Sequence, residues 1–409
     1  MKAIKNVTLI DGTGADPINN VTVVINDGFI ESITSGLNFD LSRDIVIADA
    51  GGRTMLPGLI DCHDHLANFG YDLESRWGLD EMKSLRHMKV AAVLKNTLQT
   101  GYTTVRDAAG LDAGFRQAVE QGIIQGPRLQ VALRIITPTG GIGDDVSPAV
   151  CHNPVLSEPG LPSAVANGPD GMRIKVREMV RAGADVIKFA STGGASSRSG
   201  LGPKDMLIGL DEIKALVDEA HGLGRKVMCH ALGGPGLRAG VTAGVDSIEH
   251  GTYLDEDPDL LTVMADKNIF YIPTFSVYLF HATRGTSHGR QRAKSLMYHH
   301  LKSFELAQKS GVKIVTGTDA GGWIHGNNAQ EITCFVKAGM TAMDAIVSAT
   351  SRAAECLGLD NEIGTIQPGK RADLILVDGN PLGDVSILEE GKSVRFVMKS
   401  GEVYLDELG

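Results

Sequence analysis

The sequence predicts an α/β protein, a (β/α)8 barrel that carries a small β-sandwich domain built from both ends of the chain. Two observations lead to this fold. The middle of the chain alternates short apolar runs with helical patterns, and both ends consist of short strand-like runs separated by turn signals. A length of 409 residues accommodates one barrel with an appended domain. We expect the barrel over residues 57–365 and the sandwich over residues 1–56 and 366–409.

The two ends read as β-structure because apolar runs alternate with turns such as Asp-Gly, Gly-Gly and Gly-Asn-Pro. Chain termini are often close in space, so the two ends can pair into one domain. The expected strands are Ala3–Ile10, Val21–Ile25, Phe29–Thr34, Ile45–Asp49, Ala372–Asp378, Val394–Lys399 and Glu402–Leu405.

The middle of the chain contains eight apolar runs, with helical patterns such as Leu79–Thr100, Asp211–Leu223 and Gln291–Lys309 between them. Eight βα repeats match a barrel, whereas an open doubly wound sheet is disfavoured because no Gly-rich fingerprint follows the first strand. The expected strands are Gly58–Leu66, Thr103–Ala108, Arg128–Leu133, Asp185–Ala190, Lys226–Ala231, Asp246–Gly251, Phe270–Phe275 and Lys313–Asp319. Three long loops, Arg134–Asp170, Ser276–Gly289 and Ala320–Asn328, should lie on the active-site face.

Two histidines one residue apart, His63 and His65, end the first of these strands. Residues i and i+2 of a strand point to the same face, so both imidazoles can bind one metal ion from a short piece of backbone. A lone histidine is more often structural than a ligand. The pair therefore indicates a metal site only if other strands end in further ligands.

Four further strands supply such residues. Lys188 lies in the fourth strand, His230 ends the fifth, His250 ends the sixth and Asp319 ends the eighth. Imidazole and carboxylate groups suit Zn²⁺ and neighbouring metals. A lysine inside an apolar strand is costly to bury, so Lys188 must be paired, chemically modified or functional.

We interpret three residues next to the candidate ligands as structural. Cys62, Asp64 and Cys229 should point away from the site, since successive side chains alternate along a strand. We expect both cysteines to pack and Asp64 to take part in hydrogen bonds on the helix side. Four histidines in or near a polar helical region are expected at the surface: His281, His288, His299 and His300.

With these residues the chain resembles the amidohydrolase superfamily of metal-dependent hydrolases. The shared motifs include the Pro-Gly-Leu-Ile-Asp-x-His-x-His opening and the closing Pro-Gly-Lys-Arg-Ala-Asp-Leu at 368–374. Segments 101–110 and 188–194 are similar to the branch of prolidase-like and arginine-carboxypeptidase-like peptidases and imidazolonepropionase-related proteins.

The resemblance implies a binuclear site with two divalent metal ions, expected to be Zn²⁺. It implies that Lys188 is carboxylated by CO₂ and bridges them, with His63, His65 and Asp319 on the more buried ion. His230 and His250 would hold the more exposed ion. A metal-bridging hydroxide would attack the amide carbonyl, and Asp319 would be the catalytic residue that carries its proton to the leaving nitrogen. We therefore expect a hydrolase of C–N amide bonds in a peptide, an N-acyl amino acid or another amide.

The chain also departs from the peptidases it resembles. They typically carry a histidine where this chain has Ile142, and often a tyrosine where it has Leu232. Both positions lie near the substrate in those enzymes, which argues against dipeptidase activity. A Ser-Thr-Gly-Gly segment after Lys188 is either an oxyanion-binding loop or a simple turn.

Residues of the expected front loops are the candidates for substrate contact. An arginine there can hold a carboxylate with two hydrogen bonds, and the alternative is a solvated loop charge. The candidates are Arg134, His152, Arg198, Tyr253, Tyr278, Trp323 and His325.

Three other functions remain open. A cyclic-amide hydrolase or deaminase could use the same scaffold, although mononuclear deaminases generally lack the lysine that Lys188 matches. A xenobiotic aryl-amide or carbamate hydrolase is a second alternative. A scaffold protein without metal is a third, and the six retained ligand positions argue against it.

Composition limits the partners. A net charge of −10 argues against a nucleic-acid partner. The five cysteines show no disulfide spacing. The first residues do not resemble a signal peptide and no run reaches about 18 apolar residues, so we expect a cytoplasmic protein without a membrane partner. We expect a small-molecule substrate and, as for many barrel hydrolases, assembly into a homo-oligomer.

Overall fold

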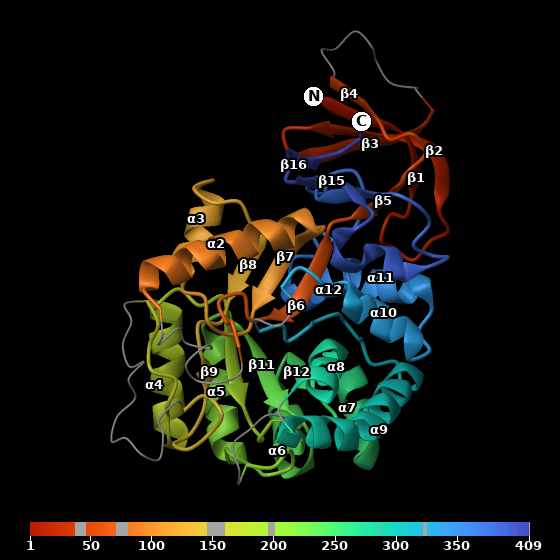
Figure 1. The fold of residues 1–409 in the computed structure, drawn as a ribbon. Coiled ribbons are helices and arrows are strands. Elements are labelled where there is room, and N and C mark those ends of the chain that lie inside the picture. Colours follow the sequence, from red (N-terminus) through yellow and green to blue (C-terminus); the bar gives the residue numbers. More distant parts are fainter. Residues whose placement is uncertain are drawn as a thin grey trace.

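The structure is a computed structural model, and it describes residues 1–36, 46–70, 81–144, 160–194, 201–285, 287–321 and 325–408. Two sheets of parallel strands lie among helices, and a third sheet combines strands from both ends of the chain (Figure 1). The α/β class expected from the sequence is therefore confirmed.

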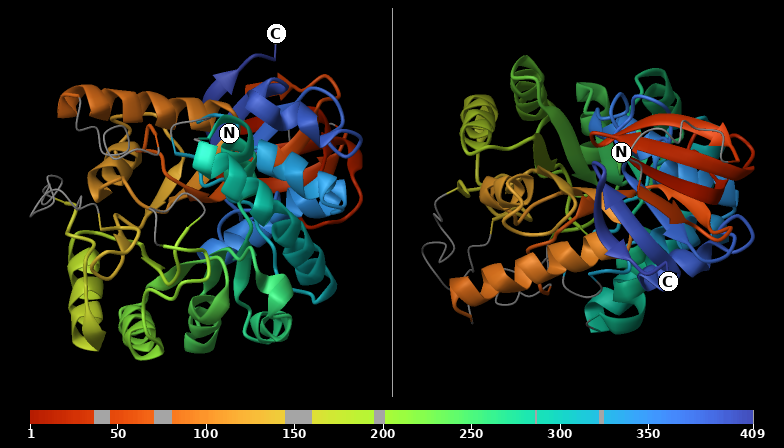
Figure 2. Two further views of the ribbon diagram at one scale, coloured as in Figure 1. Left: turned by 60° about the horizontal axis from the view of Figure 1, so that its bottom comes forward. Right: turned by 90° about the horizontal axis from the view of Figure 1, so that it is seen from above.

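The parallel strands form one sheet of three and one of five, and further views place the helices outside them (Figure 2). The first sheet has the order β6 (Leu59–Asp64), β7 (Tyr102–Asp107) and β8 (Arg128–Val131). The second contains β13 (Phe270–Ile272), β12 (Ser247–His250), β11 (Lys226–Ala231), β10 (Val186–Ala190) and β9 (Ile135–Ile136). Seven of the eight expected strands coincide with β6–β8 and β10–β13, while the two-residue β9 was not expected.

The eighth expected strand, Lys313–Asp319, is not a regular strand. Its backbone forms isolated parallel bridges, from Ile314 to Tyr271 and from Ala320 to Asp64. The amide groups of both Thr318 and Asp319 donate to the His63 carbonyl, at 3.0 and 2.7 Å. Asp319 adopts a left-handed backbone with φ of 53°, and this breaks the regular ladder. The segment still connects β13 on one side with β6 on the other.

The terminal sheet has the order β16-β15-β14-β5-β1-β2-β3, with β4 paired to β1. Its pairings are antiparallel except for β1 with β4 and β1 with β5. A separate cluster of buried residues, including Val7, Val23 and Leu374, forms its core. The strands are β1 (Lys2–Leu9), β2 (Ile18–Asn26), β3 (Phe29–Ser35), β4 (Val46–Asp49), β5 (Thr54–Pro57), β14 (Leu374–Val377), β15 (Val394–Lys399) and β16 (Glu402–Asp406).

Helix α5 shows how a helix packs on the sheet side through one apolar stripe. In α5, Ile213, Leu216, Val217 and Ala220 are buried at the i, i+3, i+4, i+7 spacing of an amphipathic helix. The described helices are α2 (Lys83–Gln99), α3 (Ala113–Glu120), α4 (Gly168–Arg181), α5 (Leu210–Gly222), α6 (Gly234–Ala243), α7 (Asp259–Asp266), α8 (Phe275–Arg284), α9 (Ser287–Lys309), α10 (Gln330–Lys337), α11 (Ala342–Ser348) and α12 (Ser351–Leu357), with 3₁₀ turns η1 (Leu254–Glu256) and η2 (Val385–Gly391).

The loop expected at Ser276–Gly289 is wrong, because this stretch forms most of α8 and the start of α9. Phe275, Tyr278 and His281 lie one turn apart and are all buried, so the segment packs as a helix. Glu331 of α10 stabilises its start by accepting hydrogen bonds from the amides of Phe275 and Ser276, both at 2.8 Å.

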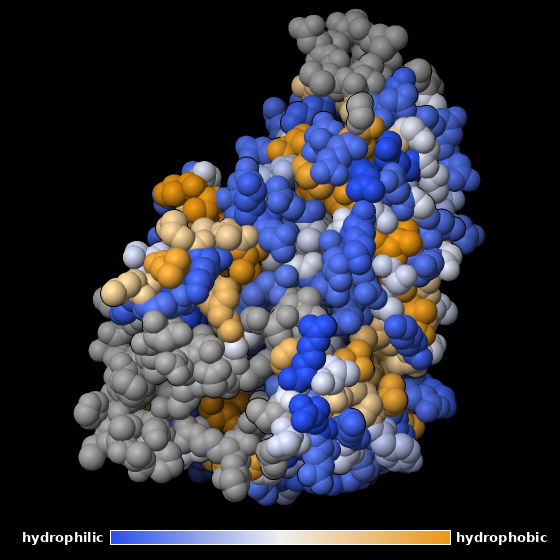
Figure 3. All heavy atoms as spheres, in the orientation of Figure 1, coloured by the Kyte–Doolittle hydropathy of each residue, from blue (hydrophilic) through white to orange (hydrophobic). Residues whose placement is uncertain are grey.

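The surface is largely hydrophilic on the face in Figure 3, with hydrophobic residues gathered over α2 and α3. Leu85 and Met88 of α2 are exposed to 51% and 65%. None of the described helices combines the length and apolar character that a membrane crossing requires.

Candidate metal centre

His63 and His65 converge on the carboxylate of Asp319. The Nε2 atoms of the two rings lie 3.3 and 3.0 Å from Asp319 Oδ1. Potential ligand atoms of the three residues lie within 4.8 Å of one another. Two imidazoles and a carboxylate are a donor set that Zn²⁺ accepts.

His230 and His250 bring two more imidazoles to the same place. Their ring centroids are 4.5 Å apart, and His250 lies 5.2 Å from His63. His250 and its neighbour Glu249 both contact His63, although successive strand residues normally point to opposite faces. The left-handed backbone of His250, with φ of 74°, ends β12 and breaks this alternation.

Lys188 of β10 is buried beside this cluster and is 1% exposed. Its Nζ atom has no hydrogen-bond partner among the described residues. Burial lowers the pKa of Lys188 to about 8, although the charges of Glu249 and Asp319 oppose that shift. An unsatisfied buried amine is costly, so this position fits a modified lysine or a metal ligand.

The protonation states of His230, His250 and Asp319 match those that metal binding requires, whereas the pKa of His63 is raised because burial is outweighed by its contacts with Glu249 and Asp319. Burial lowers the pKa of His230 to about 3 and that of His250 well below its usual value, so both imidazoles are neutral. Burial would raise the pKa of Asp319, but hydrogen bonds from His63 and His65 hold it well below the usual value. Neutral imidazole and ionised carboxylate are the forms that bind metals.

Hydrogen bonds to Nδ1 orient three of the rings. Glu249 Oε2 lies 2.6 Å from His63 Nδ1, the Ala109 carbonyl 2.8 Å from His65 Nδ1, and Thr274 Oγ1 2.7 Å from His250 Nδ1. These partners leave Nε2 of each ring for the centre. Such outer contacts fix the tautomer and orientation of metal-binding histidines.

Glu249 also joins the cluster to a buried cation that the sequence reasoning missed. Arg106 of β7 is 1% exposed, and its guanidinium lies 3.3 Å from Glu249 Oε1. Burial would raise the pKa of Glu249, but the charges of Lys188, Arg106 and His63 lower it to about 2. Arg106 and Glu249, like Lys188, are charged residues within apolar strands. The same reasoning from the sequence would have identified both.

The neighbours of the ligands pack as expected. Cys62 and Cys229 are fully buried among apolar side chains. Asp64 accepts hydrogen bonds from the His65 amide at 2.7 Å and from Asn328 Nδ2 at 2.8 Å. Asn328 belongs to the loop before α10, so Asp64 faces the helix side. After Lys188, the Ser-Thr-Gly-Gly segment brings the Gly193 carbonyl, an acceptor, to 3.5 Å from His230 Nε2.

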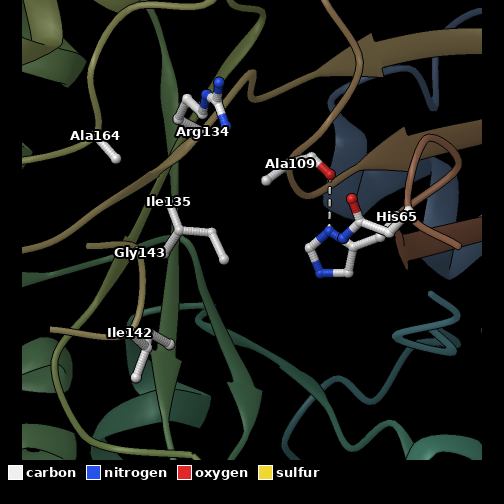
Figure 4. A pocket seen from close by; sticks show the side chains of 8 residues that line it. His65, Ala109, Arg134, Ile135, Ile142, Gly143 and Ala164 are labelled. Carbon is white, nitrogen blue, oxygen red and sulfur yellow. Dashed lines mark hydrogen bonds between the residues drawn. The ribbon is translucent and has the colours of Figure 1, made fainter. Parts of the chain in front are cut away.

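A recess opens beside His65. It is lined by His65, Asn68, Ala109, Arg134, Ile135 and Ile142, together with two small residues, and we call it the His65 recess. Figure 4 shows Arg134 at one end and Ile142 at the other, with the His65 imidazole across from Ile135. Arg134 is 5% exposed, which excludes the alternative that it is a solvated loop charge.

The other candidate substrate residues divide into three groups. Tyr278 is buried with its ring centroid 6.4 Å from that of His250, and His325 lies 3.8 Å from Asp64 with its Nε2 2.9 Å from the Asn68 carbonyl. Tyr253 lies apart from the cluster in its described contacts, since its ring is covered by Lys204 and stacks near His299. His152, Arg198 and Trp323 lie outside the described residues.

Two of the four histidines expected at the surface are buried. His281 is 6% exposed and His300 is fully buried, with its ring 4.5 Å from both Phe275 and Tyr278. The expectation failed because α8 packs over α9 and covers them. His299 is partly exposed, and the side chain of His288 lies outside the described part.

The sequence also matches known proteins. A family model described as the amidohydrolase family matches residues 54–404. Ochratoxinase of Aspergillus niger is 31% identical over 417 aligned residues, which cover 97% of this chain and 85% of that protein.

Solved structures agree with these matches. A prolidase complexed with N-methylphosphonate-L-proline is 30% identical, with a TM-score of 0.90 and 98% of both chains covered. A Xaa-Pro dipeptidase with bound methionine is 32% identical, with a TM-score of 0.89 and 99% of both chains covered. The A. niger ochratoxinase structure is 30% identical, with a TM-score of 0.88 and coverage of 99% of this chain and 95% of that one.

Proposed function

The chain belongs to the amidohydrolase family and is a hydrolase acting on carbon–nitrogen bonds, and from this premise we propose that it cleaves an amide with two divalent metal ions. One observation carries the proposal. The side chains of four histidines and Asp319 converge from separate segments beside a buried Lys188 whose amine has no partner among the described residues.

Each ion has its own protein ligands in this proposal. His63, His65 and Asp319 would hold the more buried ion, and His230 and His250 would hold the other. The neutral amine of Lys188 would add CO₂ and release one proton, and the resulting carboxylate would be the ligand shared by both ions. The pair of ions, expected to be Zn²⁺, supplies a hydroxide nucleophile at neutral pH and polarises the amide carbonyl.

The protein residues move the proton and orient the ligands. Asp319 accepts the proton of the nucleophile at its carboxylate and gives it to the leaving nitrogen as the C–N bond breaks. Glu249, Thr274 and the Ala109 carbonyl keep three imidazoles in place throughout the reaction.

We also propose that the strands close into a barrel and that the chain divides into two domains. The two parallel sheets and the segment 313–320 together form a (β/α)8 barrel over residues 57–365. The bridges from Ile314 to Tyr271 and from Ala320 to Asp64 support this closure. Residues 1–56 and 366–409 form the accompanying β-sandwich domain, which the shared sheet of both ends supports.

The substrate is a small molecule with an amide bond. The names of the similar proteins, a prolidase, a Xaa-Pro dipeptidase and an ochratoxinase, support amides of amino acids. A second candidate, a xenobiotic amide, is favoured by the ochratoxinase match together with apolar Ile142 and Leu232. A cytoplasmic location and a homo-oligomeric state remain part of the proposal, and the mass of the purified particle tests the latter.

A substrate screen with a metal count tests the proposal. Purified protein supplied with Zn²⁺ is offered N-acyl amino acids, dipeptides and aryl amides, and bound metal is measured by atomic emission. Two ions per chain and hydrolysis of at least one amide class are expected. A chain that binds no metal, or that binds two ions and cleaves none of these amides, contradicts the proposal.

Two variants separate the roles. Lys188→Ala should abolish turnover and lower the metal content, and a short carboxylate such as acetate should restore part of the activity. Full activity with two ions in Lys188→Ala would exclude the bridge.

Asp319→Asn should lose turnover while keeping most of its metal, because the amide still coordinates through oxygen but takes up no proton. Unchanged turnover in this variant would exclude the proton transfer by Asp319.

A further inference from the structure

Two buried carboxyl groups of β6 are bonded to the backbone of the histidine pair. Asp61 Oδ1 accepts a hydrogen bond from the His63 amide at 2.8 Å, and Asp64 Oδ1 accepts one from the His65 amide at 2.7 Å. Asp61 is 1% exposed and Asp64 is fully buried. The place of both histidines is therefore linked to the place of these two carboxyl groups.

A single amide group joins the two carboxyl groups. Asn328 Nδ2 lies 2.7 Å from Asp61 Oδ2 and 2.8 Å from Asp64 Oδ2. A carboxamide nitrogen carries two hydrogens, so it donates one to each acceptor. Asn328 is 1% exposed, and its Oδ1 atom has no hydrogen-bond partner within the described residues. Donation to the two carboxyl groups is thus the contact that this side chain makes.

Asp61 extends these contacts to the third proposed ligand of the more buried ion. Its Oδ2 atom also accepts a hydrogen bond from Thr318 Oγ1 at 2.8 Å. Thr318 directly precedes Asp319, and its amide donates to the His63 carbonyl at 3.0 Å. One hydrogen-bonded group therefore connects the backbone segments that carry all three ligands.

We propose that Asn328 is a positioning residue for the metal centre. Its amide group holds the carboxyl groups of Asp61 and Asp64 together, and through them it sets the spacing of the three proposed ligands of the more buried ion. The inference rests on the proposed metal-dependent hydrolysis, and Asn328 acts on the centre only through other residues.

The loop that carries Asn328 is fixed by contacts outside the centre. Asn327 Oδ1 accepts a hydrogen bond from the Glu390 amide of η2 at 2.9 Å. On the other side, His325 Nε2 lies 2.9 Å from the Asn68 carbonyl, which accepts its hydrogen. The amide group of Asn328 is therefore held in place before a metal binds, and the C-terminal segment contributes to the metal centre through η2.

The same substitution in two adjacent residues tests the inference. Asn328→Asp removes a donor and puts a third carboxyl group against two others, whereas Asn327→Asp keeps the oxygen that accepts from the Glu390 amide. Competition with a chelating dye measures the Zn²⁺ affinity of each full-length variant. Asn328→Asp should bind Zn²⁺ about 10- to 100-fold more weakly than the wild-type protein, and Asn327→Asp should stay within about threefold of it.

Amide hydrogen exchange in the metal-free chain reports on the same contacts without turnover. The peptide 59–66, which contains the His63 and His65 amides, should exchange about 10-fold faster in Asn328→Asp than in Asn327→Asp. The peptide 210–222 of α5 should exchange equally in both, whereas a general loss of stability would speed up exchange in both peptides.

Asn328→Ala keeps the test decisive if Asn328→Asp does not fold, because it removes the donor without adding a charge. It should weaken Zn²⁺ binding by about 10-fold and speed up exchange in the peptide 59–66 alone.

The results separate this inference from the proposed function. Equal Zn²⁺ affinity in the Asn328 variants and Asn327→Asp, or faster exchange throughout the chain, would overturn the positioning role and leave the amide hydrolysis standing. A wild-type protein that binds no metal, or that binds two ions and cleaves no amide, would instead overturn the proposed function.

Discussion

Glu249 links the candidate metal centre to the buried guanidinium of Arg106. Its two oxygens contact His63 Nδ1 at 2.6 Å, Ser247 Oγ at 2.5 Å and the Arg106 guanidinium at 3.3 Å. One side chain therefore orients a metal ligand and neutralises an arginine. A buried carboxylate in this position is stable only while both contacts are made.

Glu249→Gln should weaken metal binding, because Gln keeps the shape but removes the charge that holds His63 and Arg106. We expect a loss of about 10- to 100-fold in metal affinity, typical for a carboxylate behind a metal-binding histidine. Activity titrated against buffered free Zn²⁺ measures this, with kcat largely recovered at saturating metal.

Ser247→Ala is the control for that variant, since it removes only a neutral hydrogen bond to Glu249. Its metal affinity should change far less. If Glu249→Gln and Ser247→Ala bind metal equally well, the charge of Glu249 has no part in holding the site.

The side chains that meet at the centre were predicted from residue type and strand position, because coordination chemistry restricts ligands to few residue types. Arg106, Glu249 and Asn328 were not, because their roles depend on neighbours from other strands. Arg106 and Glu249 are 143 residues apart and meet only once β7 and β12 lie in the fold. The sequence likewise could not distinguish Arg134, which lines the His65 recess, from Tyr253, which lies apart from the cluster.

Strand ends are the elements at which regular patterns failed. His250 at the end of β12, Thr274 two residues after β13 and Asp319 at the end of the 313–319 segment all adopt left-handed backbone conformations. Non-glycine residues in this region cost free energy and cluster at functional sites. Alternation along a strand predicts that Glu249 and His250 face apart, so only the observed φ values explain why both contact His63.

Gly317 illustrates how tightly the 313–319 segment lies against β6. A Cβ atom at this position would lie 2.5 Å from Ile272 Cγ2 and 2.8 Å from His63 Cβ. Gly317→Ala should therefore displace His63, reduce metal affinity and destabilise the protein by about 1–3 kcal/mol, as overpacking does. Thermal unfolding and a zinc titration measure the two effects.

Gly222→Ala provides the comparison, because a Cβ there meets nothing within 4 Å. It lies in the last turn of α5 and should be neutral or slightly stabilising. A Gly317→Ala protein as stable and as strongly metal-binding as Gly222→Ala would show that β6 and the 313–319 segment can separate.

The packing of α8 on α9 makes stability depend on pH. Burial lowers the pKa of His300 to about 3, while the unfolded chain has a value near 6.5. The unfolded state thus binds a proton that the folded state does not, and stability falls as pH decreases from about 6.5 toward 3. His300→Gln should show a smaller decrease in thermal midpoint between about pH 7.5 and pH 5 than the wild-type protein.

His299→Gln tests whether burial is the cause, since His299 is adjacent on α9 but 31% exposed in its side chain. Its pH dependence should resemble that of the wild-type protein. An unchanged slope in His300→Gln would mean that other groups produce the acid sensitivity.

At the scale of the whole molecule, the sequence was sufficient for the order of elements and the pairing of the two ends. Apolar runs and turn signals are local, so β6–β8, β10–β13 and the terminal strands could be located from them. Packing between helices is not local, and the hydrophobic residues of α8 were therefore taken for a loop. The contact of β14 with β5 at Leu374 and Pro57 joins segments more than 300 residues apart.

Metal binding should stabilise the whole fold, because the proposed ligands come from β6, β10, β11, β12 and the segment before residue 320. Without ions, the Lys188 amine is buried with no hydrogen-bond partner among the described residues, and four imidazoles are buried close to it. Ions held about 1000-fold above their Kd add about 4 kcal/mol to the folded state. For a chain of this size we expect chelation to lower the thermal midpoint by roughly 5 °C. Zn²⁺ in excess of the chelator should restore the original midpoint. If protein shown to be metal-free has an unchanged midpoint, the surrounding strands alone hold the ligand cluster.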